Sequence, residues 1–419
     1  MLSLLFGIQR LRAGRKFYID ATGGSDLNDG RSPATAWQTI SKVNAFSSFL
    51  PGDRILFKRG ETYNNTRLRP VSSGKAGRPI TFDAYGSGAL PIISLNAGST
   101  TECLYLDKNY ITVRNIAFVG GVPSIEINGA NNITIEDLTI TGDATVRGNG
   151  ISIYGTDPHT LAFRRLTIAG CKCPVGGGAG IAANPASNVT IEDCVIHDCG
   201  TSPTSDHGIY LKNTTDCFVR RNLCYSNTSD GIVLSFVSNS VYEQNACYLN
   251  GNYGIGCHDT ITNVTVRNNL IYSNVSVGLM LDVVAVTEYI YNNTIVNNGT
   301  DTTHDNMQIV IGVSGAIIKN NICVYDRAVV VGNRWPINVG NAAVVANNEF
   351  DNNCYIILNG VGNTSQAVNG SSVTLANWRL QTGTPDLNGM NADPVFTTNY
   401  TDLHLQVTSP CIGAGDSTV

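Results

Sequence analysis

The chain has 419 residues and a formal net charge of −5, with 27 lysine and arginine residues against 32 aspartate and glutamate residues. This balance argues against a nucleic-acid partner, because proteins that bind phosphate backbones concentrate basic residues. No apolar stretch is long enough to span a membrane, and the cysteines form neither a metal-type CxxC pair nor a disulfide framework. A chain of this length can form two or three ordinary domains or one repeat structure.

Residues 1–15 are expected to form a short N-terminal attachment or helical segment. The apolar stretch 1–8 has no positively charged start and no small-residue cleavage site after it, so no classical signal peptide is seen. Residues 36–46 then carry four apolar side chains at helical spacing, which predicts a helix that caps the end of the following structure. These side chains are Trp37, Ile40, Val43 and Phe46.

Residues 16–350 contain strand-like segments that recur at spacings of roughly 22 to 29 residues, which indicates stacked coils. The segments align on one polar column, which should lie at turns. There, amides of successive coils can form a hydrogen-bonded ladder, and Asn tolerates the left-handed conformation. Arg165 interrupts this column without an evident reason. The predicted column consists of Asn115, Asp137, Arg165, Asp193, Asn222, Asn245, Asn269, Asn293, Asn321 and Asn348.

A second column of glycines precedes short apolar strands, and it predicts which side chains point outward. The first and third residues after each glycine should point into the core, and the second and fourth should point out. The pattern predicts an all-β, single-stranded right-handed parallel β-helix (solenoid) with an N-terminal capping helix. Residues 351–419 would add C-terminal strands and loops that cover the other end. The column consists of Gly150, Gly180, Gly208, Gly231, Gly254 and Gly278, with Asn306 in the next coil.

Three stretches near the start and one near the end resemble pectate-lyase-like β-helix proteins. They are residues 18–46 (YIDATGGSDLNDGRSPATAWQTISKVNAF), 51–63 (PGDRILFKRGETY), 77–88 (GRPITFDAYGSG) and 402–415 (DLHLQVTSPCIGAG). That superfamily holds polysaccharide lyases, glycoside hydrolases, epimerases and phage tailspikes. Its usual ligand is a polysaccharide that lies along the outer face of the strands. The resemblance implies the same fold and ligand class here, whereas the fold alone does not fix the reaction.

One group of candidate site residues lies where neighbouring strands begin. His207 and Asp230 should be about one coil spacing apart, ~4.8 Å, and we predict catalytic roles for both. Asp206 and Tyr210 are candidate substrate contacts, since a tyrosine ring can stack against a sugar. The DHG sequence before the strand is also typical of a turn, in which Asp206 would cap the backbone.

A second group lies at the far ends of the strands. Lys212, His258 and Asp282 are predicted catalytic residues, with His258 and Asp282 on adjacent coils. Lys212 also fits an ordinary solvated position. Further candidate substrate contacts are Tyr154 and Asn184 at these strand ends, and Arg220 in a turn beside Asn222.

These residues fit two reactions on a polysaccharide. In a lyase acting on an acidic polymer, Lys212 or His258 would remove the α proton, with Asp230 and Asp282 as supports. A hydrolase would need two carboxyl groups at a suitable separation. Ca²⁺ is a possible cofactor, although the acidic cluster is thin. We slightly favour the lyase.

The polysaccharide ligand points to an extracellular or virion location, although no secretion signal or disulfide pattern accompanies it. A phage tailspike reconciles these observations. It would be a homotrimer attached to other virion proteins through its N-terminal segment. One alternative is a secreted bacterial polysaccharide lyase or glycoside hydrolase. Another is a receptor-binding or structural β-helix without turnover.

Overall fold

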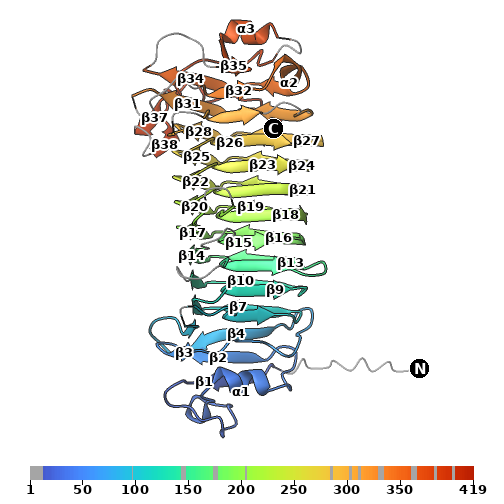
Figure 1. Ribbon diagram of the computed structural model, residues 1–419, viewed down its shortest axis with the longest axis vertical. Coiled ribbons are helices and arrows are strands. Elements are labelled where there is room, and N and C mark those ends of the chain that lie inside the picture. Colours follow the sequence, from blue (N-terminus) through green and yellow to red (C-terminus); the bar gives the residue numbers. More distant parts are fainter. Residues whose placement is uncertain are drawn as a thin grey trace, which may run out of the picture.

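The computed structural model describes residues 13–96, 98–142, 148–172, 178–202, 205–283, 286–301, 304–309, 313–328, 335–359, 366–381, 385–398 and 402–419. The stretch 1–8, for which an attachment role is expected, lies outside these residues. The described chain forms a tall stack of parallel coils, with α1 at one end and α3 at the other (Figure 1). No described helix is long and apolar enough to cross a membrane.

Three faces of parallel strands run along the stack, and the coils in its middle contribute to all three. Faces 1 and 2 belong to one 24-stranded sheet, because β18 and β21 run through both faces, and face 3 is a separate 12-stranded sheet. Face 1 consists of β6 (Leu104–Leu106), β9 (Ile125–Asn128), β12 (Ile151–Tyr154), β15 (Ile181–Ala183), β18 (Ile209–Thr215), β21 (Ile232–Glu243), β23 (Ile255–Asp259), β26 (Leu279–Val283), β29 (Met307–Ile309), β32 (Ile337–Val339) and β35 (Gln366–Val368).

Face 2 also contains the later halves of β18 and β21. Its other strands are β1 (Lys16–Ile19), β2 (Arg54–Lys58), β4 (Ile80–Tyr85), β7 (Ile111–Arg114), β10 (Ile133–Glu136), β13 (His159–Arg164), β16 (Ala186–Glu192), β19 (Phe218–Arg220), β24 (Thr262–Arg267), β27 (Val286–Tyr291), β30 (Ala316–Lys319) and β33 (Glu349–Asp351). Face 3 consists of β3 (Thr62–Asn64), β5 (Ile92–Ser94), β8 (Ala117–Val119), β11 (Thr139–Thr141), β14 (Thr167–Ala169), β17 (Val195–His197), β20 (Leu223–Tyr225), β22 (Ala246–Tyr248), β25 (Leu270–Tyr272), β28 (Thr294–Val296), β31 (Ile322–Asp326) and β34 (Cys354–Leu358).

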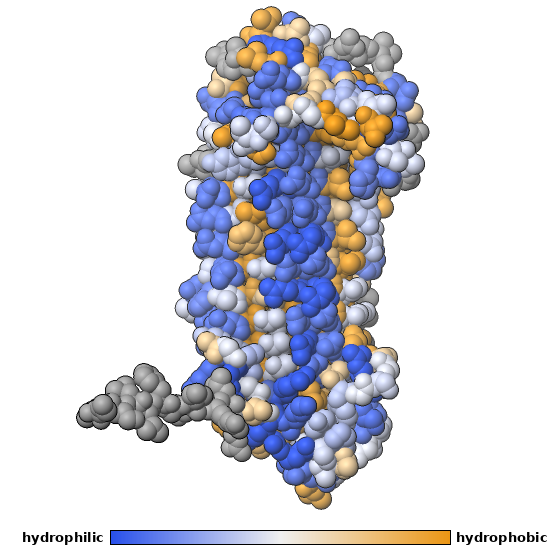
Figure 2. Space-filling model, turned by 180° about the vertical axis from the view of Figure 1, so that it is seen from behind, coloured by the Kyte–Doolittle hydropathy of each residue, from blue (hydrophilic) through white to orange (hydrophobic). Residues whose placement is uncertain are grey.

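The predicted glycine column is confirmed, and its strands stack in the expected register. Ile151 lies beside Ile181, which lies beside Ile209, so the inward positions form an apolar stack inside the solenoid. Glycine is required here because a Cβ on Gly180 would lie 2.7 Å from the carbonyl oxygen of Gly208 in the next coil. The outer surface is more polar. Seen from behind, it carries a hydrophilic band along the long axis (Figure 2).

Buried asparagines form two ladders at the turns, as the sequence suggested for one of them. In the first ladder, Asn269 Oδ1 accepts hydrogen bonds from both the backbone N–H and the side-chain amide of Asn245, at 2.9 and 3.0 Å. The Asn269 amide in turn donates to Tyr242 O at 3.0 Å. The first ladder contains Asn222, Asn245, Asn269, Asn293, Asn321 and Asn353, and the second contains Asn227, Asn250, Asn274, Asn298 and Asn306.

Four of the ten residues in the predicted polar column were wrong by one residue. Four of its members precede the ladder position and have left-handed backbone, with φ between 52° and 57°. The same shift accounts for the arginine in the predicted column. Arg165 precedes the ladder position, and its Nε donates a hydrogen bond to Asp137 Oδ1 at 2.7 Å. At the other end, Asn353 rather than Asn348 continues the ladder beyond Asn321. The four members in the left-handed position are Asn115, Asp137, Arg165 and Asp193.

The N-terminal cap is the short helix α1 (Ile40–Ala45), preceded by a 3-10 turn, η1 (Pro33–Thr35). The helix is shorter than the predicted span 36–46, because the Thr39 side chain accepts a hydrogen bond from Lys42 N and begins it. Trp37 is buried and stacks on Phe17 with ring centroids 5.1 Å apart. The predicted capping helix is therefore confirmed.

Parallel stacking continues beyond residue 350 through β34 and β35. The remaining elements are β36 (Ser371–Val373), antiparallel to β35, the helices α2 (Ala342–Ala346) and α3 (Leu375–Arg379), and the antiparallel pair β37 (Phe396–Thr398) and β38 (Asp402–Leu405). The C-terminal segment returns to the stack, where Asn320 Nδ2 donates to Asp416 O at 3.0 Å.

Candidate functional site

A groove crosses face 1 at β12, β15 and β18, and it has a volume of about 550 Å³. The surface is hollowed here because β15 presents small residues. One of them, Ala182, lies between Ser152 on one neighbouring coil and Tyr210 on the other. Three predicted substrate contacts, Tyr154, Asn184 and Tyr210, are brought together here. We call this the tyrosine groove. It is lined by Asn149, Ser152, Ile153, Tyr154, Ala179, Ala182, Ala183, Asn184, Ser205 and Tyr210.

His207 and Asp230 form a close pair at the edge of the tyrosine groove. Their coils stack so that His207 Nδ1 lies 2.8 Å from Asp230 Oδ2, with side-chain exposures of 10% and 3%. The other oxygen of Asp230 accepts a hydrogen bond from Tyr253 N at 2.7 Å, which fixes the carboxylate. The imidazole ring lies 5.2 Å from the ring of Tyr210, a wall of the groove. A histidine whose Nδ1 faces a carboxylate, beside a sugar-sized groove, can transfer a proton to or from a ligand.

Asp206 does not face the groove and is corrected here as a substrate contact. It is fully buried. Its carboxylate accepts hydrogen bonds from the backbone N–H groups of Gly178, Thr201 and Ser202 at 2.6 to 2.7 Å. The residue stabilises the turns that precede the strands, which is the alternative that the DHG sequence left open.

His258 and Asp282 are adjacent on face 1, as predicted, but their contact is loose. His258 Nδ1 lies 4.0 Å from Asp282 Oδ2, and the aspartate is largely exposed. The imidazole leans over Gly256, where a Cβ would lie 2.7 Å from Nε2, and its ring is 5.7 Å from that of Tyr253. Burial, and then the nearby carboxylates of Asp230 and Asp282, raise the pKa of Tyr253.

Lys212 shares a column with His258, but Ser235 lies between them. The ammonium group is 5.9 Å from the centre of the Phe236 ring, on the side away from β15. Lys212, His258 and Asp282 thus lie along the same face as the tyrosine groove without lining it.

Arg220 lies on face 2, so it is corrected as a contact in this site. Its guanidinium binds Glu192 Oε2 at 2.8 Å. The same carboxylate group accepts Arg164 Nε at 2.5 Å and Arg221 Nη2 at 3.0 Å. Burial works against a low pKa for Glu192, but the surrounding guanidinium groups outweigh it and lower that pKa. Arg220 is part of a charged ladder that stabilises the stack.

Sequence reasoning missed Glu126, which lies behind Tyr154 on the N-terminal side of the groove. This nearly buried carboxylate accepts a hydrogen bond from the hydroxyl of Tyr154. Burial, followed by this hydrogen bond, raises the pKa of Tyr154. The signal was available, because SIEIN at 124–128 aligns with GISIY at 150–154 and Glu126 lies beside Ser152. Ser124 takes the place of the column's glycine in that coil.

The described residues do not offer a metal centre. No group of three or more His, Cys, Asp or Glu side chains converges among them, whereas Ca²⁺ takes six to eight oxygen ligands. The pair His207 and Asp230 has no third ligand of this kind in that part of the chain. These residues therefore do not fit the Ca²⁺ that the sequence left possible.

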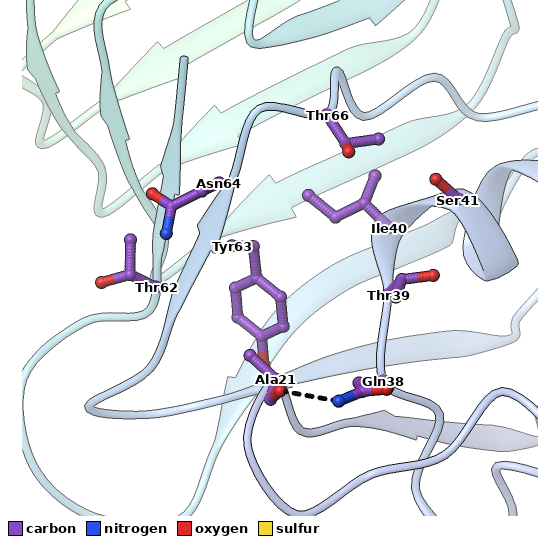
Figure 3. Close-up of a pocket in the computed structure, with 9 residues that line it drawn as sticks. All are labelled: Ala21, Gln38, Thr39, Ile40, Ser41, Thr62, Tyr63, Asn64 and Thr66. Carbon is purple, nitrogen blue, oxygen red and sulfur yellow. Dashed lines mark hydrogen bonds between the residues drawn. The ribbon is translucent and has the colours of Figure 1, made fainter. Parts of the chain in front are cut away.

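A second cavity of about 400 Å³ lies at the N-terminal cap, between α1 and β3 (Figure 3). Its lining consists of hydroxyl, amide and apolar groups, and the Gln38 amide donates to Ala21 O at 3.3 Å. The one phenol, Tyr63, is buried and donates to Ile19 O at 2.8 Å. Its residues include no acidic, basic or histidine side chain, so the tyrosine groove remains the better candidate for chemistry.

Comparisons with known proteins agree on the fold. A family model described as a right handed beta helix region matches residues 123–284, and a search of curated sequences found no significant match. A GH136 lacto-N-biosidase from Eubacterium ramulus has a TM-score of 0.58 and 16% identity over 76% of this chain and 65% of its own. This chain thus spans less than two thirds of that enzyme's length.

Two further solved structures are similar at low identity. The pectate lyase Pel9A has a TM-score of 0.54 and 16% identity over 97% of this chain and 93% of its own. The A-module of the mannuronan C-5 epimerase AlgE6 from Azotobacter vinelandii has a TM-score of 0.50 and 19% identity over 76% of this chain and 90% of its own. Together with the stacked parallel coils, these matches identify the chain as a right-handed parallel β-helix protein.

Proposed function

We propose that this protein binds a polysaccharide across the outer surface of face 1 and cleaves it beside His207. The observation that carries the proposal is the pair His207 and Asp230 at the edge of the tyrosine groove, 2.8 Å apart. Tyr154 and Tyr210 offer aromatic surfaces for sugar rings, and Asn184 offers an amide for sugar hydroxyls. The three similar enzymes act on carbohydrates, as their names state, which is consistent with this ligand class.

In this mechanism His207 moves the proton. Asp230 Oδ2 lies 2.8 Å from Nδ1, so Nε2 is the nitrogen left to accept a proton from the substrate or to return one to the leaving oxygen. The phenol of Tyr210, beside the imidazole, is placed to contact the same sugar. Lys212, His258 and Asp282 would contact sugars further along the chain, because they follow on later coils of face 1.

Elimination fits these residues better than hydrolysis. A glycoside hydrolase typically uses two carboxyl groups about 5 to 10 Å apart. Glu126 and Asp230 flank the groove but are separated by four coil steps, about 19 Å at the usual spacing. Asp206, the other carboxylate near the pair, is committed to backbone N–H groups. For elimination, one histidine can remove the α proton and return it to the leaving oxygen, provided that the carboxyl group of the uronate is neutralised, as it is in an ester.

The test is product analysis on a broad polysaccharide panel. Elimination creates an unsaturated sugar that absorbs in the ultraviolet, whereas hydrolysis releases reducing ends without this absorbance. We expect the unsaturated product. Reducing ends alone would replace elimination by hydrolysis, and the absence of both products would leave a binding protein.

A trimeric tailspike, attached to a virion, is the second candidate. One observation favours self-association: Leu223, Leu249 and Leu270 are exposed on or next to face 3. Beside them, the rings of Tyr225, Tyr248 and Tyr272 stack 4.9 to 5.0 Å apart. Exposed apolar patches are typical of protein interfaces. Mass photometry tests this proposal, and a monomer at micromolar concentration would count against it.

A further inference from the structure

We infer that the tyrosine groove binds uncharged glycans rather than acidic ones, so that the elimination proposed above acts on a uronate whose carboxyl group is esterified. This inference rests on the proposed function and narrows its substrate class. It departs from the acidic polysaccharide that the sequence suggested.

The lining of the groove is complementary to hydroxyl groups rather than to carboxylates. Its polar side chains are amides, hydroxyls and phenols, and the described lining residues include no lysine, arginine or histidine. Asn149 Nδ2 donates to Ser152 Oγ at 2.7 Å, and Asn149 Oδ1 accepts from Ala179 N at 2.8 Å, so both groups are held in place. Fixed donors and acceptors of this kind pair with sugar hydroxyls, and the tyrosine rings offer apolar faces.

In the described part of the chain, two carboxylates border the groove. Glu126 lies behind Tyr154 on one side, and Asp230 lies behind His207 on the other. Lys212 is the nearest described lysine on face 1, and its ammonium group lies over Phe236, in the coil beyond the groove. Among the residues that the structure describes, a uronate in the groove would therefore meet negative charge on two sides and no cation in the lining.

This arrangement penalises a polyanion twice. The carboxylate of each bound uronate loses water without gaining an ionic partner, and the acidic border repels it. Along the rest of face 1, Glu102 is already paired with Arg67, and Asp282 adds further negative charge. An esterified uronate avoids both penalties and keeps the proton that His207 would remove.

The test compares three forms of one polymer: polygalacturonate, its methyl ester and its carboxyl-reduced form. They share the same linkages and differ in the carboxyl group. The same three forms of alginate provide a second series, and an array of neutral and acidic polysaccharides covers other linkages. We expect at least tenfold tighter binding of the uncharged members of a bound series. Their affinity should vary little with salt, because no ion pair is formed.

Variants at Ala182 separate the groove from the rest of the surface. Ala182→Phe should fill the groove and abolish binding. Ala182→Lys should place a cation in it and shift the preference toward the acidic form by tenfold or more. Ala162→Phe and Ala162→Lys are matched controls, because Ala162 is a partly exposed alanine on β13 of face 2. The controls should keep the affinity and preference of the parent protein.

The outcomes distinguish this inference from the proposed function. Tighter binding of the acidic members, weakened by salt, would overturn the uncharged substrate and leave polysaccharide binding intact. Binding that Ala182→Phe does not reduce would also overturn the inference, because the ligand would lie elsewhere. No binding to any polysaccharide on the array would overturn the proposed function itself.

Discussion

His207 Nδ1 lies 2.8 Å from Asp230 Oδ2, although the two residues belong to successive coils of the solenoid. The strands that follow them pair residue by residue, with Ile209 beside Ile232 and Tyr210 beside Val233. The backbone register, rather than the side-chain contact itself, therefore places the imidazole next to the carboxylate. A site built in this way depends on regular stacking, and substitutions can test chemistry and stacking separately.

Replacing His207 tests the proposed base. His207→Ala should lower turnover by about 10² to 10⁴-fold, because a positioned acid–base group typically contributes that much. Asp230→Asn should give a smaller loss, since the amide oxygen can still accept the hydrogen bond from Tyr253 N. Turnover is measured by product formation, and circular dichroism checks the fold. His159→Ala, at a partly exposed histidine of face 2, is the control. Full activity in both variants would shift the role of base to Lys212 or His258.

Gly256 tests whether His258 contacts the substrate. A Cβ at this position would lie 2.7 Å from His258 Nε2, so Gly256→Ala should displace the imidazole. His258→Ala removes it altogether. If His258 donates one hydrogen bond to a bound sugar, both variants should weaken binding by about fivefold, equivalent to about 1 kcal/mol. Turnover at saturating substrate should be unchanged. A large fall in turnover would instead assign His258 to the chemistry, as the sequence suggested.

The asparagine ladder should contribute strongly to stability. Asn269→Ala removes an acceptor for two hydrogen bonds from Asn245 and a donor to Tyr242 O, all in a buried site. Each buried group left unsatisfied costs about 1 to 3 kcal/mol, so the free energy of unfolding should fall by about 3 kcal/mol or more. Urea denaturation measures the change. Asn64→Ala, at an exposed asparagine of β3, should change stability by less than about 0.5 kcal/mol. Equal effects would contradict a special role for the ladder.

Glu288 should make the protein less stable as the pH rises. Its side chain is fully buried, neither carboxylate oxygen has a hydrogen-bond partner among the described residues, and burial raises its pKa from 4.5 to about 8. Between these values the folded chain holds a proton that the unfolded chain has released. Unfolding is therefore favoured by about 1.4 kcal/mol for each pH unit in this window.

Glu288→Gln should remove this part of the pH dependence. Unfolding midpoints at pH 5 and pH 8 should differ less in the variant than in the parent protein. Asp386, whose pKa burial raises to about 6, contributes equally to both proteins and cancels in the comparison. Identical pH profiles would show that Glu288 ionises normally in the folded chain.

Much of the site could be located from the sequence because its register follows from the glycine column. Counting from that column correctly placed His207 next to Asp230 and His258 next to Asp282. Arg220, which the sequence placed in a turn beside Asn222, instead ends β19 on another face. The counting also missed Glu126, because the first coil of the pattern has Ser124 in place of glycine.

The period of the sequence alone determined the solenoid, the inward and outward alternation and the order of side chains along face 1. These features depend on backbone geometry, which repeats every two residues within a strand and every coil along the stack. The tertiary structure alone decided which outward side chains act together. Asp206 turned inward to satisfy backbone N–H groups, and Lys212 leaned toward Phe236. The groove exists because small alanines lie between two tyrosines on neighbouring coils. Its depth depends on the side-chain volumes of several coils together, so the sequence of one strand does not predict it.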